Sequence, residues 1–142
     1  MPGPFSICQL DWDSGRDALL TVRREVFVVE QQVPEEIEVD EHDPVSLHFL
    51  AVDSTGLPIG TARLLSNGRV GRMAVREDWR RSGVGRALLT EVIATARRRG
   101  DSRLFLHAQV HSIPFYESLG FVVCGDEFEE AGIPHREMHR VL

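Results

Sequence analysis

The segment from Val70 to Arg99 constrains the fold of this chain more than any other. Its first part, Val70–Val75, is short and apolar, as expected for a strand. Its last part, Ala87–Arg99, has apolar residues at helical spacing, and the loop Arg80–Arg86 between the two parts contains two glycines. A strand, a glycine loop and a helix in this order direct free backbone N–H groups and the positive end of the helix toward a phosphate. We therefore predict a phosphate-binding turn in a domain that mixes strands and helices.

The residues of this loop also favour a phosphorylated ligand. Glycine has no Cβ, so a ligand can lie directly against the main chain at Gly83 and Gly85. Three arginines add positive charge around the same point. The predicted cofactor-binding residues of the loop are Arg80, Arg81, Ser82, Gly83, Val84, Gly85 and Arg86.

Two other glycine motifs do not fit the loop. The P-loop ends in Gly-Lys followed by Ser or Thr, whereas all 16 basic residues of this chain are arginine. The dinucleotide fingerprint G-x-G-x-x-G lacks its third glycine, because Leu88 stands at that position. The pattern that does fit is [Q/R]-x-x-G-x-[G/A], as Arg80-x-x-Gly83-x-Gly85.

Two motifs together carry a resemblance to the GNAT N-acetyltransferase superfamily. Met73–Leu89 is similar to its acetyl-CoA segment, and Leu104–Gln109 resembles the next strand. Ser112–Phe121 resembles the signature A-x-x-F-Y-x-x-x-G-F, with Ser112 in place of the alanine. The resemblance covers residues 5 to 142. Arg24–Pro34 and Gly132–His135 are similar to a small bacterial branch of uncharacterised members, and the first of these stretches also resembles one in the hexosamine-phosphate acetyltransferases.

The resemblance implies a fold, and periodicity gives its elements. We expect one domain, 1–142, with the α+β (mixed α/β) fold of GNAT acyl-CoA N-acyltransferases: a mixed, mostly antiparallel sheet of six to seven strands flanked by helices. Helices are predicted over 14–29, with Ser14 or Asp13 as N-cap, over 87–99 and over 113–119. Strands are predicted over 5–10, 47–53, 59–65, 70–75, 103–109, 121–124 and 135–141. In the family, the two central parallel strands, here 70–75 and 103–109, splay apart to admit the pantetheine arm of the cofactor.

Composition excludes several classes of protein. The net charge of −6 argues against general nucleic-acid or anionic-membrane binding. No apolar run approaches membrane-spanning length, and residues 1–5 lack the features of a signal peptide. Cys8 and Cys124 are too few for a disulfide framework or a cysteine metal site, so we expect reduced thiols packed in strands of a cytoplasmic protein without a metal. The sequence leaves open whether the protein forms a homodimer.

The activity that the resemblance implies is direct transfer of an acetyl group from acetyl-CoA to a primary amine of a small molecule, with an amine of a protein as the less favoured acceptor. By resemblance, backbone N–H groups from Arg81 to Arg86 bind the pyrophosphate, and the exposed backbone of Met73, Ala74 and Val75 pairs with the pantetheine. An N–H group there polarises the thioester carbonyl, with Gln109 close by. Tyr116 stands where the family often has the acid that protonates the departing thiolate. The alternative for Tyr116 is packing alone.

The base that deprotonates the amine has several candidates. Histidine titrates near neutral pH, so His111, just after the strand 103–109, and His48, at the start of a central strand, are placed first and second. Glu30 and Glu117 are further candidates. Arg72 and Glu30 are predicted to contact the substrate; the alternative for Arg72 is an ion pair with Glu30 or another carboxylate.

The stretch Glu35–Asp43 contains six carboxylates. Such a run is usually a solvated, mobile face, although in GNAT folds this loop covers the acceptor site and could attract a cationic amine. Arg97–Arg99 is expected to be the charged end of a helix, favourable at its negative dipole end.

One competing function remains at this stage. A non-catalytic acyl-CoA-binding module or regulatory partner would keep the Arg80–Arg86 loop without an aligned acid and base. The presence of Tyr116 favours the enzyme. The residues do not indicate which amine is the acceptor.

Overall fold

The computed structural model describes residues 3–142, except for the side chains of residues 36 and 37. It contains seven strands: β1 (Phe5–Leu10), β2 (Leu47–Asp53), β3 (Pro58–Leu64), β4 (Arg69–Val75), β5 (Arg103–Gln109), β6 (Val122–Glu130) and β7 (Ile133–Val141). The α-helices are α1 (Trp12–Arg23), α2 (Glu35–Glu38), α3 (Val84–Arg99) and α4 (Ile113–Glu117). A π-helix, η1 (Arg24–Glu30), continues α1, and short 3-10 turns are η2 (Asp43–Val45), η3 (Glu77–Trp79) and η4 (Val110–Ser112).

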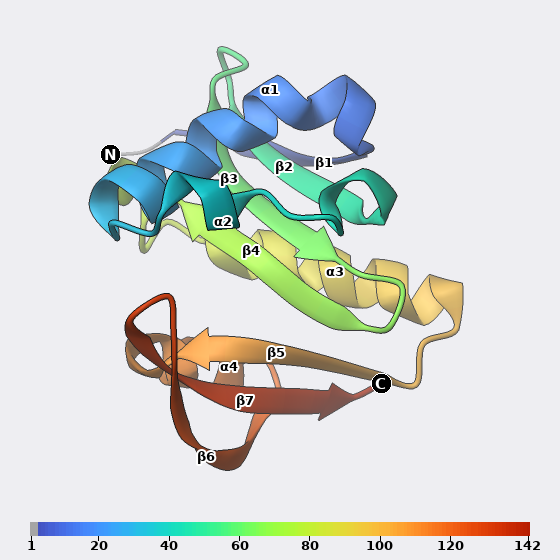
Figure 1. The fold of residues 1–142 in the computed structure, drawn as a ribbon. Helices are drawn as coiled ribbons and strands as arrows, with labels where there is room; N and C mark the ends of the chain where they lie inside the picture. The colour runs from blue at the N-terminus through green and yellow to red at the C-terminus, as the bar shows by residue number, and fades with distance from the viewer. Residues whose placement is uncertain (1–2) are drawn as a thin grey trace.

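The seven strands form one mixed sheet in the order β1-β2-β3-β4-β5-β7-β6. All neighbouring strands are antiparallel except β4 and β5. Helices α1 and α2 cover one face of the sheet, and α3 and α4 cover the other (Figure 1). The predicted fold class is therefore confirmed.

The sheet divides between β4 and β5. These strands pair only at Arg69–Phe105 and Val70–Leu106, and they then separate toward their carboxyl ends (Figure 1). A bulge bends β4 just beyond the last pair, because Arg72 adopts a positive φ of 47° and the register with β3 shifts there. The hydroxyl of Thr61 donates to the carbonyl of Arg72 at 2.9 Å and holds the bulge. The splay expected from the family is confirmed.

The largest apolar core lies between the sheet and α3. The helix buries the apolar face that its spacing predicted, against strand residues such as Phe49, Ile59 and Leu104. Gly83, with φ 92°, begins the helix, and Gly100, with φ 90°, ends it. The core thus fixes the start of α3 against the end of β4.

Several predicted boundaries were wrong. The first helix begins at Trp12, because the Asp11 carboxylate accepts from the Ser14 N–H at 2.8 Å and so caps it. This helix also stops being α-helical at Arg23 and widens into η1, whose run of Val26, Phe27, Val28 and Val29 forms α-helix poorly. The helix predicted over 113–119 is shorter, ending at Glu117, and the one predicted over 87–99 begins three residues earlier.

The last hairpin is also longer than predicted. The strand expected over 121–124 continues to Glu130, because pairing with β7 resumes at Phe128–His135 after a bulge. Cys124 lies half-buried in β6, but Cys8 is exposed on β1, so the expectation that both thiols pack inside the sheet was wrong for Cys8. No helix within residues 3–142 is long and apolar enough to cross a membrane.

Candidate active site

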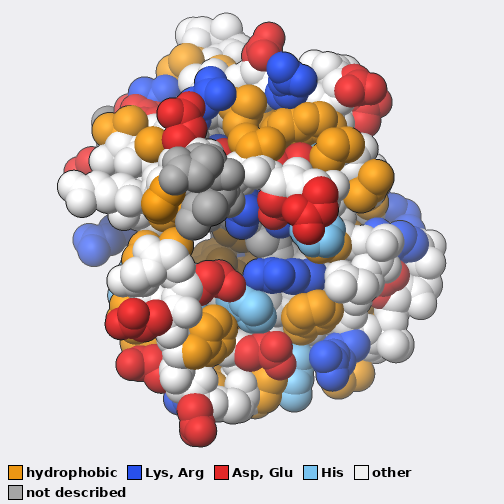
Figure 2. Space-filling view, viewed as in Figure 1, with side chains coloured by type: hydrophobic (Ala, Val, Ile, Leu, Met, Phe, Trp, Pro, Cys, Tyr) orange, Lys and Arg blue, Asp and Glu red, His pale blue; other side chains and the backbone are white. Residues whose placement is uncertain are grey.

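A cleft of about 1190 Å³ passes through the sheet where β4 and β5 separate. On the α3 face its walls come from the Arg80–Arg86 loop and from α4. On the α1 face they come from η1, from the α2 segment and from the β6–β7 turn. Figure 2 shows the hollow between the two halves of the molecule, with arginine, acidic and histidine side chains gathered around it. Residues from both faces of the sheet therefore line one continuous cleft.

The Arg80–Arg86 loop surrounds the α3 end of the cleft, as predicted. Arg81 (φ 62°) and Gly83 (φ 92°) turn the chain so that α3 starts at the cleft wall. A Cβ at Gly85 would lie 3.4 Å from Phe115 Cζ, on the wall itself. The side chains of Ser82 and Val84 lie elsewhere, since Ser82 donates to the Trp79 carbonyl and Val84 is buried in the core. Only the backbone of those two residues could contact a ligand.

Two of the predicted site residues bind each other. Arg80 donates to both carboxylate oxygens of Glu30, at 2.6 and 2.5 Å, and to the carbonyl of Val75 at 3.0 Å. The hydrogen bond from Arg80 lowers the pKa of Glu30 below its usual value. This ion pair joins η1 to the Arg80–Arg86 loop beyond the end of β4, so Glu30 is already engaged, and the carboxylates that the structure places against Arg72 are Asp40 and Glu38.

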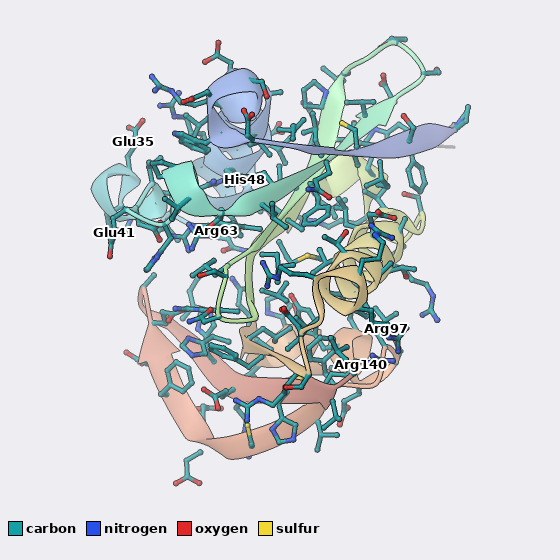
Figure 3. The ribbon with its side chains drawn as sticks, turned by 90° about the vertical axis from the view of Figure 1, so that its right-hand side faces the viewer. Glu35, Glu41, His48, Arg63, Arg97 and Arg140 are labelled. Atoms are coloured by element: carbon teal, nitrogen blue, oxygen red, sulfur yellow. The ribbon has the colours of Figure 1, made fainter. Side chains whose placement is uncertain are left out.

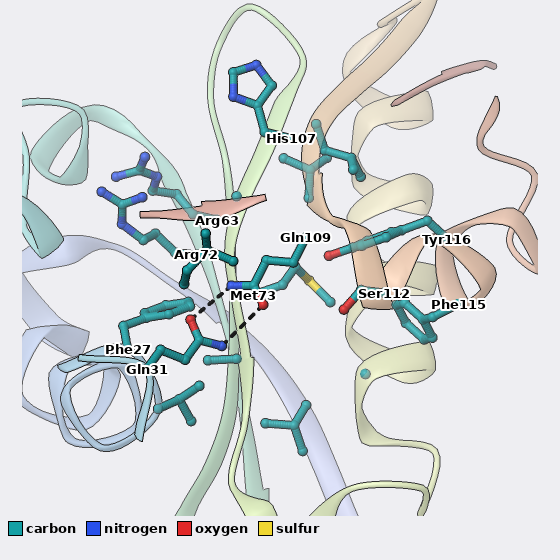
Figure 4. A pocket seen from close by; sticks show the side chains of 18 of the residues that line it. Phe27, Gln31, Arg63, Arg72, Met73, His107, Gln109, Ser112, Phe115 and Tyr116 are labelled. Carbon is teal, nitrogen blue, oxygen red and sulfur yellow. Dashed lines mark hydrogen bonds between the residues drawn. The ribbon is translucent and has the colours of Figure 1, made fainter. Parts of the chain in front are cut away.

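Tyr116 lies where the two faces of the cleft meet. Its ring is 9% exposed and packs edge-on against Phe115 and Phe121, with centroids 5.1 and 6.0 Å away. Its hydroxyl points into the cleft toward Gln109 (Figure 4). Burial raises the pKa of Tyr116 to about 12, so the phenol keeps its proton at neutral pH. The group can donate a proton inside the cleft.

Gln109, predicted beside the cofactor, pairs with a glutamine that sequence reasoning missed. Its amide donates to Gln31 Oε1 at 2.9 Å, and the Gln31 amide donates back at 3.4 Å (Figure 4). We call these two residues the glutamine pair. It joins η1 to the end of β5 across the divided sheet. The only sequence signal for Gln31 was its place in the Arg24–Pro34 stretch that resembles a family branch.

The two histidine candidates for the base lie in different places. His111 is exposed on η4 and lines the cleft, as expected. His48 is 1% exposed and does not line it, so the prediction that it stands beside the substrate was wrong. Its Nε2 lies 2.8 Å from the carbonyl of Asp43, and its ring packs on Trp12 with centroids 5.3 Å apart. His48 fixes the η2 turn beneath α1.

The burial of His48 has a measurable effect on stability. Burial lowers the pKa of His48 below its usual 6.5, so protonation favours the unfolded chain. The stability that neutral His48 contributes is present above pH 6.5 and is lost as pH falls below it toward the folded-state pKa. We expect urea midpoints to decrease from pH 7 to pH 5 in the wild type. A His48→Gln variant should show a shallower decrease over that interval, and an equal slope in both proteins would contradict this role.

Part of the acidic stretch is buried rather than solvated, which corrects the prediction for Glu38 and Asp43, whereas Glu35 and Glu41 are exposed as expected. Glu38 and Asp43 are 2% and 0% exposed, and they bind Arg23, which is itself fully buried. Arg23 donates to Glu38 Oε1 at 2.5 Å and to both oxygens of Asp43 at 2.9 and 3.1 Å. Three carboxylates are thus balanced by three arginines in an ion-pair network made of Arg23, Glu38, Asp40, Asp43, Arg63 and Arg72. Arg63 of this network is labelled in Figure 3, together with Glu41 and His48.

The network changes how the α1 side of the cleft is understood. Arg72, predicted to contact the substrate, donates to Asp40 Oδ2 at 3.0 Å and to the Glu38 carbonyl at 2.9 Å. Arg63, which the sequence did not single out, donates to Asp40 at 2.7 Å. Three of the six carboxylates proposed to attract a cationic amine, Glu38, Asp40 and Asp43, are therefore paired with arginines inside the protein. What they do is hold α2 against β3 and β4.

The β6–β7 turn supplies a further group that sequence reasoning missed. His107 Nδ1 lies 2.9 Å from Glu130 Oε1 and 3.1 Å from Arg69 Nη2. Burial opposes ionisation of Glu130, but His107 outweighs it and lowers the pKa of Glu130. His135 is buried nearby, with Nε2 3.8 Å from Glu130. No spacing rule connects these residues, because four strands, β4 to β7, bring them together. Among the described side chains, no group of three or more His, Cys, Asp or Glu is arranged to hold a metal ion.

Comparison with known proteins decides the family. Residues 13–142 match the family model described as the acetyltransferase (GNAT) domain. The chain belongs to the GNAT acetyltransferase family. It is 38% identical over 121 residues to the uncharacterized N-acetyltransferase YjcF of Bacillus subtilis, which covers 82% of this chain and 86% of the relative.

Solved structures agree with this assignment. An acyl-CoA N-acyltransferase from Pseudomonas aeruginosa superposes with a TM-score of 0.85 at 31% identity, covering 96% of this chain and 99% of that one. Escherichia coli ElaA gives the same values. The GNAT fold and an acyltransferase activity that uses acyl-CoA are thus established for this chain, and the two motifs that suggested the family from sequence pointed to the right one.

Proposed function

We propose that this GNAT protein transfers the acetyl group of acetyl-CoA directly to a primary amine of a small molecule. The observation that carries the proposal is the cleft itself, which opens on both faces of the sheet with the Tyr116 hydroxyl between them. One face offers a phosphate-binding helix start and the other a polar chamber. Such a shape suits two substrates that meet at one point.

The residues of the α3 face fit the cofactor. The cradle at Gly85 is bounded by Phe115, and a side chain there would fill it. Arg81 and Arg86 line the same end of the cleft, beside the N–H groups at the start of α3. Beyond Val70, none of the described strands pairs with β4 on the β5 side, so this edge of Met73, Ala74 and Val75 is available to a pantetheine arm, except for the Val75 carbonyl, which accepts from Arg80. When bound, acetyl-CoA supplies the activated acyl group.

The remaining steps belong to residues of this chain. A backbone N–H beside the bulge at Arg72 would polarise the acyl carbonyl. His111 would accept the proton of the amine, through water, and Tyr116 would give its proton to the sulfur that leaves. Both lie on the connection that follows β5, so one short segment positions the acid and the base. His48, which is buried elsewhere, has no part in the proposal.

An amine library tests the activity directly. Purified protein with acetyl-CoA and single amines should release CoA with some of them, with the acetylated amine detected by mass spectrometry. Detection by mass is preferable to a thiol reagent, because Cys8 is an exposed free thiol that would react as well. Tight acetyl-CoA binding with no acetylated product across a broad library would favour the non-catalytic acyl-CoA-binding module.

Gly85 provides a test of where the cofactor binds. Gly85→Ala stays within the [G/A] pattern, and its methyl group would lie in ordinary contact with Phe115, so this variant should fold and keep its affinity for acetyl-CoA. Gly85→Val adds two further methyl groups at the cleft wall. Its acetyl-CoA affinity, measured by calorimetry, should fall by about tenfold through displaced polar contacts. A second control is Thr90→Val, an exposed position of the same helix, which should leave affinity unchanged. Unaltered affinity in a folded Gly85→Val would place the cofactor elsewhere.

A further inference from the structure

The glutamine pair is a neutral polar contact that spans the cleft on the α1 face. Gln31 and Gln109 are 78 positions apart, both are half-buried, and they meet beside Met73, where the strands have separated (Figure 4). Each amide has two N–H donors and an oxygen with two lone pairs. The reciprocal bonds use one donor and one lone pair of each side chain. Each glutamine thus keeps one donor and one acceptor for a ligand.

The described charged groups around the glutamine pair already have polar partners. Arg72 and Arg63 bind Asp40, Arg80 binds Glu30, and Glu130 lies within hydrogen-bond distance of His107. A charged group of a ligand would have to displace one of these partners, or be desolvated without a counter-ion. Opening the glutamine pair requires only the exchange of two amide hydrogen bonds, one of them long at 3.4 Å.

The donors and acceptors of the glutamine pair also determine which chemical group of a ligand can take the place of their mutual hydrogen bonds. Because Gln31 and Gln109 each donate and accept, a group that enters between them must do both. A carboxamide or a hydroxyl does both, whereas a carboxylate only accepts and an ammonium only donates. Either charged group would leave a glutamine donor or acceptor without a partner, which is costly in a half-buried site.

We propose that Gln31 and Gln109 determine acceptor specificity by opening to bind an uncharged hydrogen-bonding group, a carboxamide or hydroxyl, beside the acceptor amine. Apolar walls of Val26, Phe27 and Val33 contact the rest of the molecule. The acceptor is thus a primary amine that carries a neutral polar substituent. This inference rests on the proposed amine acetylation.

The test uses five small primary amines that differ in one substituent: glycinamide, ethanolamine, glycine, ethylenediamine and propylamine. Rates of acetylation are compared as kcat/KM per unprotonated amine. We expect glycinamide and ethanolamine to exceed the other three by about 3- to 10-fold, the range of one or two good hydrogen bonds. Glycine or ethylenediamine ranking first in the wild type would overturn the inference.

Variants of Gln31 show whether the pair causes the preference. Gln31→Met keeps the length of the side chain and removes its hydrogen bonds, so the preference should disappear. Gln31→Glu should move the preference toward ethylenediamine, and it serves as the second variant if Gln31→Met does not fold. Gln9→Met, an exposed glutamine on β1, is the matched control and should keep the wild-type ranking. Acetyl-CoA affinity is measured for each protein.

The outcomes separate this inference from the proposed function. Acetylation with a ranking that Gln31→Met and Gln31→Glu leave unchanged would overturn the inference and keep the function. If no amine is acetylated, binding of the five amines in the presence of CoA is compared by saturation-transfer NMR. Selective binding of glycinamide that is lost in Gln31→Met would then support the role of the glutamine pair in ligand selection. The same result, without acetylation, would contradict the proposed acetyltransferase function. Equal binding of all five, or no binding, would overturn the inference.

Discussion

Replacing Tyr116 with phenylalanine should lower kcat by about 10²- to 10⁴-fold, the usual contribution of general acid catalysis. The hydroxyl faces the cleft, and burial raises its pKa to about 12, so in the wild type it is protonated over the whole range in which the protein can be assayed. Phenylalanine keeps the edge-on packing on Phe115 and Phe121 and removes only the proton donor. Steady-state kinetics on an amine from the screen measures the effect.

Stability gives this experiment an internal control. The structure assigns no protein hydrogen bond to the Tyr116 hydroxyl among the described residues, so its loss removes no bond from the fold. The free energy of unfolding of Tyr116→Phe should therefore stay within about 0.5 kcal/mol of wild type. Acetyl-CoA affinity should also change little. Near-normal kcat in this well-folded variant would assign Tyr116 to packing and leave protonation of the sulfur to water.

The sequence predicted the central fold accurately where periodicity and core burial agree. β1, β2 and β5 have the bounds that alternation predicted, and the apolar face of α3 is the face that is buried. β6 was predicted too short because its second half is rich in Asp and Glu, which have low strand propensity. Pairing with β7 outweighs that propensity. Local composition cannot show a partner strand.

The candidate site likewise has one part that the sequence could predict and another that it could not. The position of the Arg80–Arg86 loop at the cleft could be predicted because one short segment contains all of its residues. The glutamine pair and the ion-pair network could not, because Gln31 meets Gln109 across 78 positions and Arg23 meets Glu38 and Asp43 across 15 and 20. A run of carboxylates has a solvated face as its ordinary interpretation. Only tertiary structure shows that buried arginines face it here.

Arg23 carries the prediction with the largest effect on stability. Its guanidinium is buried together with Glu38 and Asp43, and removing one partner of a buried ion pair leaves an uncompensated charge. We expect Arg23→Met to lower the free energy of unfolding by about 3–5 kcal/mol, measured by urea denaturation. That is a large share of the roughly 5–15 kcal/mol of a typical domain. The matched control is Arg24→Met on the adjacent residue, whose ion pair with Glu35 is solvent-exposed and should contribute less than about 1 kcal/mol.

The acid limb of the stability curve distinguishes loss of the ion pair from loss of packing. Burial alone would raise the pKa of Asp43, but the hydrogen bonds and charge of Arg23 outweigh burial and hold this pKa at about 2, below its usual 3.8. Ionised Asp43 therefore stabilises the wild type above pH 3.8, and this stability is lost as pH falls toward 2. Without Arg23 the folded-state pKa rises, so the slope between pH 4 and pH 2 should flatten or reverse. Arg23→Lys keeps the charge without the two-oxygen contact, and should lie between wild type and Arg23→Met in both measurements. An Arg23→Met variant with near-wild-type stability and an unchanged acid slope would show that the network contributes nothing, and that α2 is held over the acceptor side of the cleft by other contacts.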